Sequence, residues 1–305
     1  MGFAKFMELA LYHPDVGYYR RQHQRIGYEP GTDFYTASST GPIFGEMVAA
    51  ACAEILRTVG RDPHDHVFVE LGAEPGGEGV LTGISHPFRE VQIVRIGDSL
   101  AFPADCVVFS NELFDAQPCV RSRFHAGRWI EIGVELRGDT LTEVELVSPP
   151  PYRPTVPSLT DGYRFDQPLA AAQLAGQIAA AHWRGLFVAM DYGKTLRDLL
   201  EATPGGTARA YYRHAQSNDL LANPGEQDLT CHVCWDWIVD ELRLHGFSKP
   251  QLNFQETFFV RHAGSFIASL TQAEAAHFSR RKLALMQLLH PAQMGQKFQV
   301  LHAWR

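Results

Sequence analysis

Residues 66–72 (HVFVELG) and 104–115 (ADCVVFSNELFD) decide the fold class of this chain. Each is a short apolar run, typical of a strand that is buried on both faces of a parallel sheet, and each stops abruptly in acidic and small residues. In open parallel sheets, ligands bind beyond the carboxyl ends of the strands. The acids at these ends are therefore candidate site residues, and we expect an α/β protein of the enzyme type.

Length and composition exclude several classes of protein. The chain has 305 residues, of which 45% are hydrophobic, enough for one large domain or for one core with an appendage. The 27 basic and 34 acidic residues give a net charge of -7, and no dense basic stripe is present to attract a nucleic acid. No apolar run reaches the roughly 18 residues of a membrane-spanning helix, and a secretion signal is missing. We expect a soluble, cytoplasmic protein whose partners are proteins or small molecules.

The five cysteines are scattered and mostly lie among apolar residues, which is typical of reduced core positions. Cys231 and Cys234 are separated by two residues, a spacing that suits zinc or redox chemistry. A structural zinc site needs a second ligand pair of similar spacing, which the sequence lacks, so we expect no metal. We interpret the pair as small hydrophobic residues near the start of a helix.

Strand and helix patterns alternate along the rest of the chain and predict a doubly wound sheet. Further strands are expected at residues 91–96, 105–110, 185–190 and 254–261, and helices at 3–12, 43–59, 166–183, 234–245 and 278–289. Two strand-like runs flank the turn at residues 137–139 (RGD) and predict a β-hairpin near 128–147. We expect an N-terminal helical or lid segment over residues 1–60, and a sheet domain over 61–305 that carries this hairpin and C-terminal helices.

The first strand runs into a loop of acids and glycines, residues 70–79 (ELGAEPGGEG). Its glycines let the backbone turn tightly and approach a ligand closely. The spacing is not G-x-G-x-x-G, and Glu74 and Glu78 disfavour a pyrophosphate. A cationic or zwitterionic cofactor suits the loop better, and S-adenosylmethionine meets that description. An ordinary glycine-rich turn is the alternative.

Residues 111–116 (NELFDA) follow the second strand of the opening pair, where a substrate would meet the cofactor. A carboxylate there would hold a guanidinium by paired hydrogen bonds and turn one nitrogen toward a methyl donor. A helix start is an equally good interpretation, with Asn111 as the cap and Glu112 and Asp115 in the first turn. Asp191, which follows a later strand, likewise suits either a site acid or a turn residue.

An ordered series of motifs extends over nearly the whole chain: YHPDVGYY (12–19), GTDFYT (31–36), FGE (44–46), VELG (69–72), NELFDA (111–116), MDYG (190–193), GTARAYYRH (206–214), NPGEQDLTCHV (223–233) and MGQKFQVL (294–301). By these motifs the chain resembles the MidA-like family of class I S-adenosylmethionine-dependent methyltransferases, which includes the mitochondrial complex I assembly methyltransferase. The resemblance implies a Rossmann-like sheet and methyl transfer from S-adenosylmethionine to an arginine of a protein substrate.

The resemblance also implies which positions form the site. The catalytic candidates are Glu112, Asp115 and Asp33. The cofactor-binding candidates are Glu70, Gly72, Gly76, Gly77, Gly79, Asp98 and Asn111. Phe34, Asp191, Tyr192, Asp228 and His232 are the candidates on the substrate side. His232 has two interpretations, a base or a neutral core histidine that is hydrogen-bonded to backbone.

The amino-terminal half departs from the family pattern. The family loop has the form E-L-G-x-G-x-G, whereas three residues separate Gly72 from Gly76. Only 39 residues (111 minus 72) lead from Gly72 to Asn111, which is too few for two helical crossovers and their strands, so the cofactor-binding half is shortened by one unit. Asp98 lies about 20 residues after the loop, where a ribose-binding acid is expected. If the strand before it is the family's third, that acid has been lost, and the sequence of residues 97–100 favours this second interpretation.

Two functions of different class follow from the motifs. The first is an active methyltransferase with a remodelled cofactor pocket, which the retained strand-end acids favour. The second is a degenerate relative that acts as a binding or assembly factor without catalysis, which the shortened cofactor half favours. A nicotinamide oxidoreductase is weaker, because it predicts a regular G-x-G-x-x-G and a loop without acids.

Overall fold

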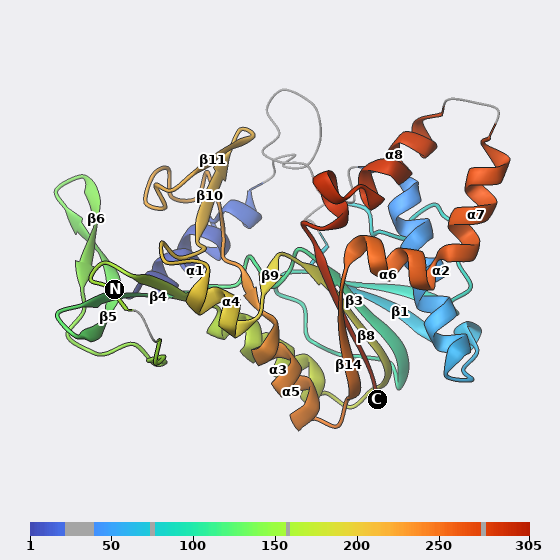
Figure 1. Ribbon diagram of the computed structural model, residues 1–305, viewed down its shortest axis with the longest axis horizontal. Coiled ribbons are helices and arrows are strands. Elements are labelled where there is room, and N and C mark those ends of the chain that lie inside the picture. Colours follow the sequence, from blue (N-terminus) through green and yellow to red (C-terminus); the bar gives the residue numbers. More distant parts are fainter. Residues whose placement is uncertain (22–39, 74–76, 157–158, 276–278) are drawn as a thin grey trace. The chain divides into compact units, whose positions relative to one another are not determined.

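The described part of the chain forms two compact units. The computed structural model describes residues 1–21, 40–73, 77–156, 159–275 and 279–305 (Figure 1). We call the first unit the hairpin unit; it comprises Met1–Phe34, Phe114–Gln177 and Gly193–Glu241. The second, the sheet unit, comprises Tyr35–Leu113, Ile178–Tyr192 and Leu242–Arg305.

The sheet unit is built on a six-stranded sheet with the order β14-β15-β8-β3-β1-β2 (Figure 1). Its strands are β1 (Val67–Leu71), β2 (Glu90–Val94), β3 (Asp105–Asn111), β8 (Arg184–Asp191), β14 (Ser248–Phe254) and β15 (Gln299–Trp304). The four neighbouring strands β2, β1, β3 and β8 pair in parallel, whereas β15 is antiparallel to both of its neighbours. The mostly parallel sheet confirms the α/β class that the apolar runs predict.

The carboxyl ends of the parallel strands lie at one edge of the sheet. Leu71 pairs with Val94 of β2 and with Ser110 of β3, and Asn111 pairs with Met190 of β8. Every residue of β1 is buried, as expected for a strand that is covered on both faces. The acids that follow these strands therefore gather at a single edge.

Helices and a continuous apolar core cover the central strands. The helices of the sheet unit are α2 (Pro42–Thr58), α6 (Gln255–His262), α7 (Gly264–Ala273) and α8 (Arg280–Leu289), with the short helices η3 (Pro63–Asp65) and η4 (Pro291–Gly295). The core joins Phe44 and Met47 of α2, Phe109 of β3, Phe258 of α6 and Leu288 of α8, all of them buried. The helical spacing of apolar residues over 43–59 is thus confirmed.

The sheet is short on the side of the cofactor loop. Among the described residues, β2 pairs with β1 and is the last strand on that side, so one described strand lies beyond β1. The residues described between these two strands, 72–73 and 77–89, contain no helix. Both observations confirm the shortening that the residue count predicts, and they place the strand expected at 91–96 directly beside β1.

The hairpin unit contains three small sheets. The first has the order β6-β5-β4-β7, the second β11-β10-β12, and the third pairs β13 with β9. Their strands are β4 (Val120–His125), β5 (Arg128–Arg137), β6 (Thr140–Glu145), β7 (Arg164–Gln167), β9 (Gly193–Lys194), β10 (Arg209–Tyr212), β11 (Ala215–Ser217), β12 (Asp228–Thr230) and β13 (Val233–Cys234). β5 and β6 pair across Gly138 and Asp139, which confirms the predicted hairpin.

The helices of the hairpin unit pack on two apolar clusters. They are α1 (Phe3–Tyr12), α3 (Leu169–Ala180), α4 (Leu196–Glu201) and α5 (Trp235–Leu244), with η1 (Tyr18–Arg20). α1 has the predicted bounds and buries Phe3 and Leu11 in a cluster with Cys231, while Cys234 belongs to the second cluster. All five cysteines are free and buried, which confirms their interpretation as core residues. Among the described helices, none has the length and apolar character needed to cross a bilayer.

One predicted strand is wrong, and one predicted helix is present but shorter than expected. Residues 254–261 form the end of β14 and most of α6 instead of a strand. Gln255, Phe258 and Phe259 are buried at helical spacing, and the aromatic residues of this segment, which are frequent in strands, hide that period. The helix predicted at 166–183 starts only at Leu169. Pro168 disfavours helical backbone in the residue before it, and Asp166 instead belongs to β7.

Candidate active site

Glu70 holds the cofactor loop from β1. Its Oε2 accepts a hydrogen bond from the Val80 amide at 2.7 Å, and only 9% of the residue is exposed. Burial raises the pKa of Glu70 to about 7, against the opposing effects of the Val80 amide and the positive charge of Arg95. The carboxyl thus ties the far end of the loop to the strand where the loop begins.

The loop glycines lie where larger residues do not fit. Gly72 has a φ of +77°, and a Cβ added there would lie 2.7 Å from Cδ1 of Leu113. At Gly79 an added Cβ would lie 2.6 Å from Cδ1 of Ile93 and 2.8 Å from Oε2 of Glu70. Close packing therefore requires glycine at both positions, and the left-handed backbone requires it at Gly72 as well. Gly76 lies outside the described residues.

Asn111 and Glu112 form an ordered pair at the end of β3. The Glu112 amide donates to the Met190 carbonyl at 2.9 Å, and Oε1 of Glu112 accepts from Nδ2 of Asn111 at 2.9 Å. The φ of Glu112 is +51°, and no helix occurs between β3 and β4. The helix-start interpretation of residues 111–116 is therefore wrong: a residue in the left-handed region does not continue into an α-helix.

Two buried polar atoms at the end of β3 have no hydrogen-bond partner among the described residues: Oγ of Ser110 and Oδ1 of Asn111. Buried polar groups are normally hydrogen-bonded, so such atoms beside a glycine loop fit the hydroxyl or amino groups of a ligand. With the carboxyl of Glu70 and the acid Glu112, this edge offers mostly acceptors. A cofactor with a positively charged sulfonium and an amino group fits this set of acceptors.

Asp191 and Tyr192 end β8 at the same edge. Asp191 is fully buried, and its Oδ1 accepts from the Tyr192 amide at 2.8 Å. The ring of Tyr192 lies on Phe298, with the ring centroids 4.1 Å apart. The amide contact fits a turn residue and burial at a strand end fits a site acid, so both interpretations of Asp191 stay open.

Asp98 follows β2 in an exposed turn. Its Oδ2 accepts from the Arg95 amide at 2.8 Å, and its own amide donates to the Arg95 carbonyl at 3.0 Å. Because β2 is the neighbour of β1, Asp98 occupies the position that a ribose-binding acid takes in dinucleotide folds. Its role in cofactor binding stays a prediction.

The remaining described candidates belong to the hairpin unit. Asp115 and Asp228 are buried, and Oδ1 of Asp228 accepts from the Tyr19 hydroxyl at 3.0 Å. Burial, with Lys194 and Arg209 nearby, lowers the pKa of His232 to about 4. A histidine that is neutral at pH 7 and this weakly basic fits a core position better than a base. Asp33 and Phe34 lie outside the described residues.

Two polar contacts, one in each unit, escape the sequence patterns. Oδ2 of Asp166 accepts from the amides of Thr207 and Ala208 at 2.7 and 2.8 Å, and its Oδ1 accepts from Nε of Arg121 at 2.9 Å, so a buried ion pair holds the start of the motif at residues 206–214. The other is Arg95, whose Nη2 donates to the Gly77 carbonyl at 2.8 Å. In the sequence, the one feature that could have indicated a role for Arg95 is its positive charge directly after a strand.

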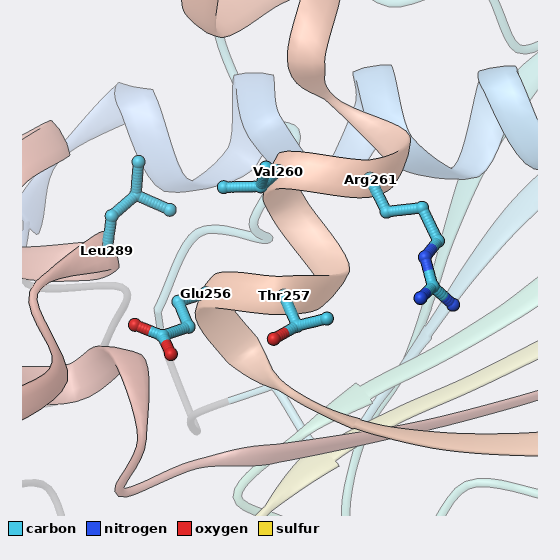
Figure 2. Close-up of a pocket in the computed structure, with 5 residues that line it drawn as sticks. All are labelled: Glu256, Thr257, Val260, Arg261 and Leu289. Carbon is cyan, nitrogen blue, oxygen red and sulfur yellow. The ribbon is translucent and has the colours of Figure 1, made fainter.

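A surface pocket in the sheet unit lies apart from these candidates. Figure 2 shows its lining from α6 and α8, formed by Glu256, Thr257, Val260, Arg261 and Leu289. It contains none of the strand-end acids. We therefore do not assign it to the candidate active site.

A family model described as "Putative S-adenosyl-L-methionine-dependent methyltransferase" matches residues 90–249, slightly more than half of the chain. The match starts in β2, so it includes the motifs at 111–116, 190–193 and 206–214 but leaves out β1 and the glycine loop. Among curated proteins, none matches the sequence.

Two crystal structures from Burkholderia thailandensis share the fold. One, described as a "likely methyl transferase" bound to S-adenosyl-homocysteine, is 24% identical with a TM-score of 0.82 and covers 100% of this chain and 88% of its own. The other, of an uncharacterized protein, is 23% identical with a TM-score of 0.77 and covers 100% and 87%. These likenesses confirm the predicted Rossmann-like methyltransferase fold.

Proposed function

This chain belongs to a family of S-adenosylmethionine-dependent methyltransferases, and we propose that it transfers a methyl group from this cofactor to an arginine side chain of a protein. The observation that carries the proposal is the ordered carboxylate of Glu112. It leaves β3 in a left-handed backbone conformation and is hydrogen-bonded to Asn111. A carboxylate fixed in this way is suited to orienting a cationic acceptor.

The cofactor would lie against the glycine loop and the end of β3. Glu70, Gly72, Gly77, Gly79 and Asn111 are the residues we assign to it, with Asp98 for the ribose hydroxyls. When bound, S-adenosylmethionine supplies an electrophilic methyl group on a sulfonium. The acids at this edge match the positive charge of that sulfonium, and the loop glycines allow close approach of the backbone. The S-adenosyl-homocysteine bound in the Burkholderia thailandensis structure supports the class of cofactor, while the residues that hold it are our proposal.

An arginine acceptor follows from the chemistry of Glu112. A guanidinium presents its donors in a planar fork that pairs with a carboxylate through two parallel hydrogen bonds. Such pairing localises positive charge toward the carboxylate and directs another nitrogen away from it, toward the methyl donor. Asp115, Asp191 and Tyr192 are further candidates on the acceptor side, as are Asp33 and Phe34 outside the described residues.

Calorimetric titration with S-adenosyl-homocysteine, followed by transfer from a labelled methyl donor to proteins of a cell extract, tests the proposal. We expect Glu112→Gln to bind the cofactor normally but to lower the yield of methylarginine at least about tenfold, because it removes charge while keeping shape. Glu90→Gln, at the opposite end of the sheet, is the matched control and should leave the yield unchanged. Unchanged transfer by Glu112→Gln would remove Glu112 from the catalytic machinery.

The same titration distinguishes the enzyme from the alternative, a binding or assembly factor without catalysis. The shortened cofactor half is the observation that favours this alternative. If millimolar S-adenosyl-homocysteine gives no heat with the full chain, the enzyme proposal fails and the assembly factor replaces it. We also propose a cytoplasmic location, for which cell fractionation is the test.

A further inference from the structure

Arg95 connects the end of β2 to the cofactor loop. Its guanidinium donates through Nη2 to the carbonyl of Gly77 at 2.8 Å, across 18 residues of chain. The side chain is partly buried. A charged donor makes a stronger hydrogen bond than a neutral one, so this contact constrains the loop more than an ordinary backbone bond would.

The backbone of Arg95 is itself fixed. Its amide donates to the carboxylate of Asp98 at 2.8 Å, and its carbonyl accepts from the Asp98 amide at 3.0 Å. Gly97 lies inside this turn with a φ of +96°. The guanidinium therefore extends from a rigid turn at the end of the strand.

The loop is held from two strands at once. Glu70 of β1 accepts from the amide of Val80, and Arg95 after β2 donates to the carbonyl of Gly77. In a complete βαβ unit, the helix after the first strand orders the loop through its own backbone bonds. No helix is present in the described residues between β1 and β2, so these two side chains supply the order that a helix would give.

We propose that Arg95 is a positioning residue for cofactor binding, whose guanidinium holds the Gly77 carbonyl so that the loop glycines keep the shape the methyl donor requires. The proposal rests on the proposed function and extends it to a residue that contacts the loop instead of the reacting atoms. The charge of Arg95 also opposes the effect of burial on Glu70 and so favours its carboxylate form.

Three variants test the proposal. Arg95→Met removes the donor and the charge, and Arg95→Lys keeps a charged donor on a long stem. Arg89→Met is the matched control, because Arg89 immediately precedes β2, is exposed, and donates to the Asp65 carbonyl at 3.2 Å, away from the loop. We measure the dissociation constant of S-adenosyl-homocysteine, the melting temperature, and amide exchange over residues 77–80.

We expect Arg95→Met to bind S-adenosyl-homocysteine at least about tenfold more weakly, from the loss of one charged hydrogen bond. Arg95→Lys should recover affinity to within about threefold of the wild type, a rescue estimated from the retained charge-assisted donor. Exchange over residues 77–80 should accelerate in Arg95→Met only. Unchanged affinity and exchange in Arg95→Met would overturn the proposal, as would equal losses in Arg95→Met and Arg89→Met.

The outcomes separate this proposal from the proposed function. If the wild type does not bind S-adenosyl-homocysteine, the proposed function fails, and amide exchange alone decides whether Arg95 orders the loop. If the wild type binds and Arg95→Met binds equally well, only the role of Arg95 fails. Should Arg95→Met not fold, Arg95→Gln, with a neutral and shorter donor, takes its place with the same expected loss.

Discussion

The two flanks of the six-stranded sheet are ordered by different forces. On the β8–β15 flank, six consecutive residue pairs run from Asp191↔Gln299 to Leu186↔Trp304, and the strands pack on an apolar core. On the β1–β2 flank, the last strand is partly exposed, and the connection is fixed by the side chains of Glu70 and Arg95. Stability is thus concentrated on one flank, whereas in our proposal cofactor binding depends on single polar contacts of the other.

This difference separates two kinds of mutational effect. Changes on the apolar flank should alter the free energy of unfolding, since apolar burial is roughly proportional to stability. Changes to the polar side-chain contacts of the loop flank should alter ligand affinity first, whereas a change to a closely packed loop glycine should alter both affinity and stability. Four predictions can break or sharpen this separation.

The largest effect is expected for Gly72→Ala. The left-handed backbone costs about 1–2 kcal/mol for a residue with a Cβ, and displacing Leu113 adds about 1–3 kcal/mol of overpacking. We expect a loss of about 2–5 kcal/mol in the free energy of unfolding. Affinity for S-adenosyl-homocysteine should fall more than about 30-fold, since 1.4 kcal/mol is a factor of ten. Denaturant unfolding and calorimetry measure the two quantities.

Gly83→Ala is the control for this variant. Gly83 has a similar φ of +72°, but an added Cβ would meet no atom within 4 Å. It should therefore show only the backbone cost, about 1–2 kcal/mol, with unchanged affinity. Equal loss of affinity in both variants would mean that the contact with Leu113 is unimportant to the loop.

His302→Phe tests the apolar flank through its pH dependence. Burial, together with His262 and Arg261, lowers the folded pKa of His302 to about 4, below its ordinary value of 6.5. A lowered histidine pKa means that the unfolded chain binds more protons between these values, so stability is lost as pH falls from 6.5 to 4. The ring contacts Phe258 and His262, and Nε2 has no partner among the described residues, so phenylalanine fits.

Between pH 7 and pH 4.5, the loss in the free energy of unfolding should be about 2–3 kcal/mol smaller for His302→Phe than for the wild type, an estimate from 1.36 kcal/mol per pKa unit. Denaturant unfolding at the two pH values measures this difference. The exposed His64 provides the control variant His64→Gln, which removes a histidine without touching the core around His302. If the free energy of unfolding depends on pH in the same way in His302→Phe and in the wild type, His302 is not a buried neutral histidine.

Glu70→Gln tests the loop flank through the charge of the ligand. Because the pKa of Glu70 is about 7, the carboxylate forms mostly between pH 6 and 8, and affinity for the cationic S-adenosylmethionine should rise about tenfold over that range. Glutamine should abolish the rise while keeping an acceptor for Val80. The raised folded pKa also means that stability present below pH 4.5 is lost as pH rises through 7. Relative to the wild type, the variant should therefore be more stable at pH 8 than at pH 5.

The smallest effect is expected for Asp98→Asn. Asparagine keeps an acceptor for the Arg95 amide but weakens bonds to ribose hydroxyls, so affinity for S-adenosyl-homocysteine should fall about threefold to fivefold, from a partial loss of charge in one hydrogen bond. Methylthioadenosine, which keeps the ribose, should lose the same factor, whereas adenine should lose nothing. If all three ligands bind as to the wild type, Asp98 serves only the turn.

Much of the sheet unit can be predicted from its sequence because its signals are local. The buried runs of β1, β3 and β8 are continuous and apolar, and the acids at their ends mark the site. Counting the residues from Gly72 to Asn111 suffices to predict the missing unit. α6 is not predictable in this way, because burial of Phe258 and Phe259 depends on the core that α2 and α8 complete.

The polar contacts of the site are harder to predict. The bond from Arg95 to Gly77 depends on the path of the loop, and the bonds from Asp166 to Thr207 and Ala208 join segments about 40 residues apart. Such pairings are tertiary, so neither periodicity nor turn chemistry indicates them. The sequence indicates that charged residues lie at strand ends, but it does not indicate which groups they bind.

The position of β2 at the rim of the sheet also bears on solubility. An outermost strand presents backbone amides and carbonyls to which another chain can add a strand, and such addition is a common start of aggregation. The charged residues Arg89 and Glu90 stand at the beginning of this strand, where charge discourages that addition. Neutralising both side chains in one variant should therefore promote aggregation at high protein concentration, whereas each single neutralisation leaves one charge in place at the start of the strand.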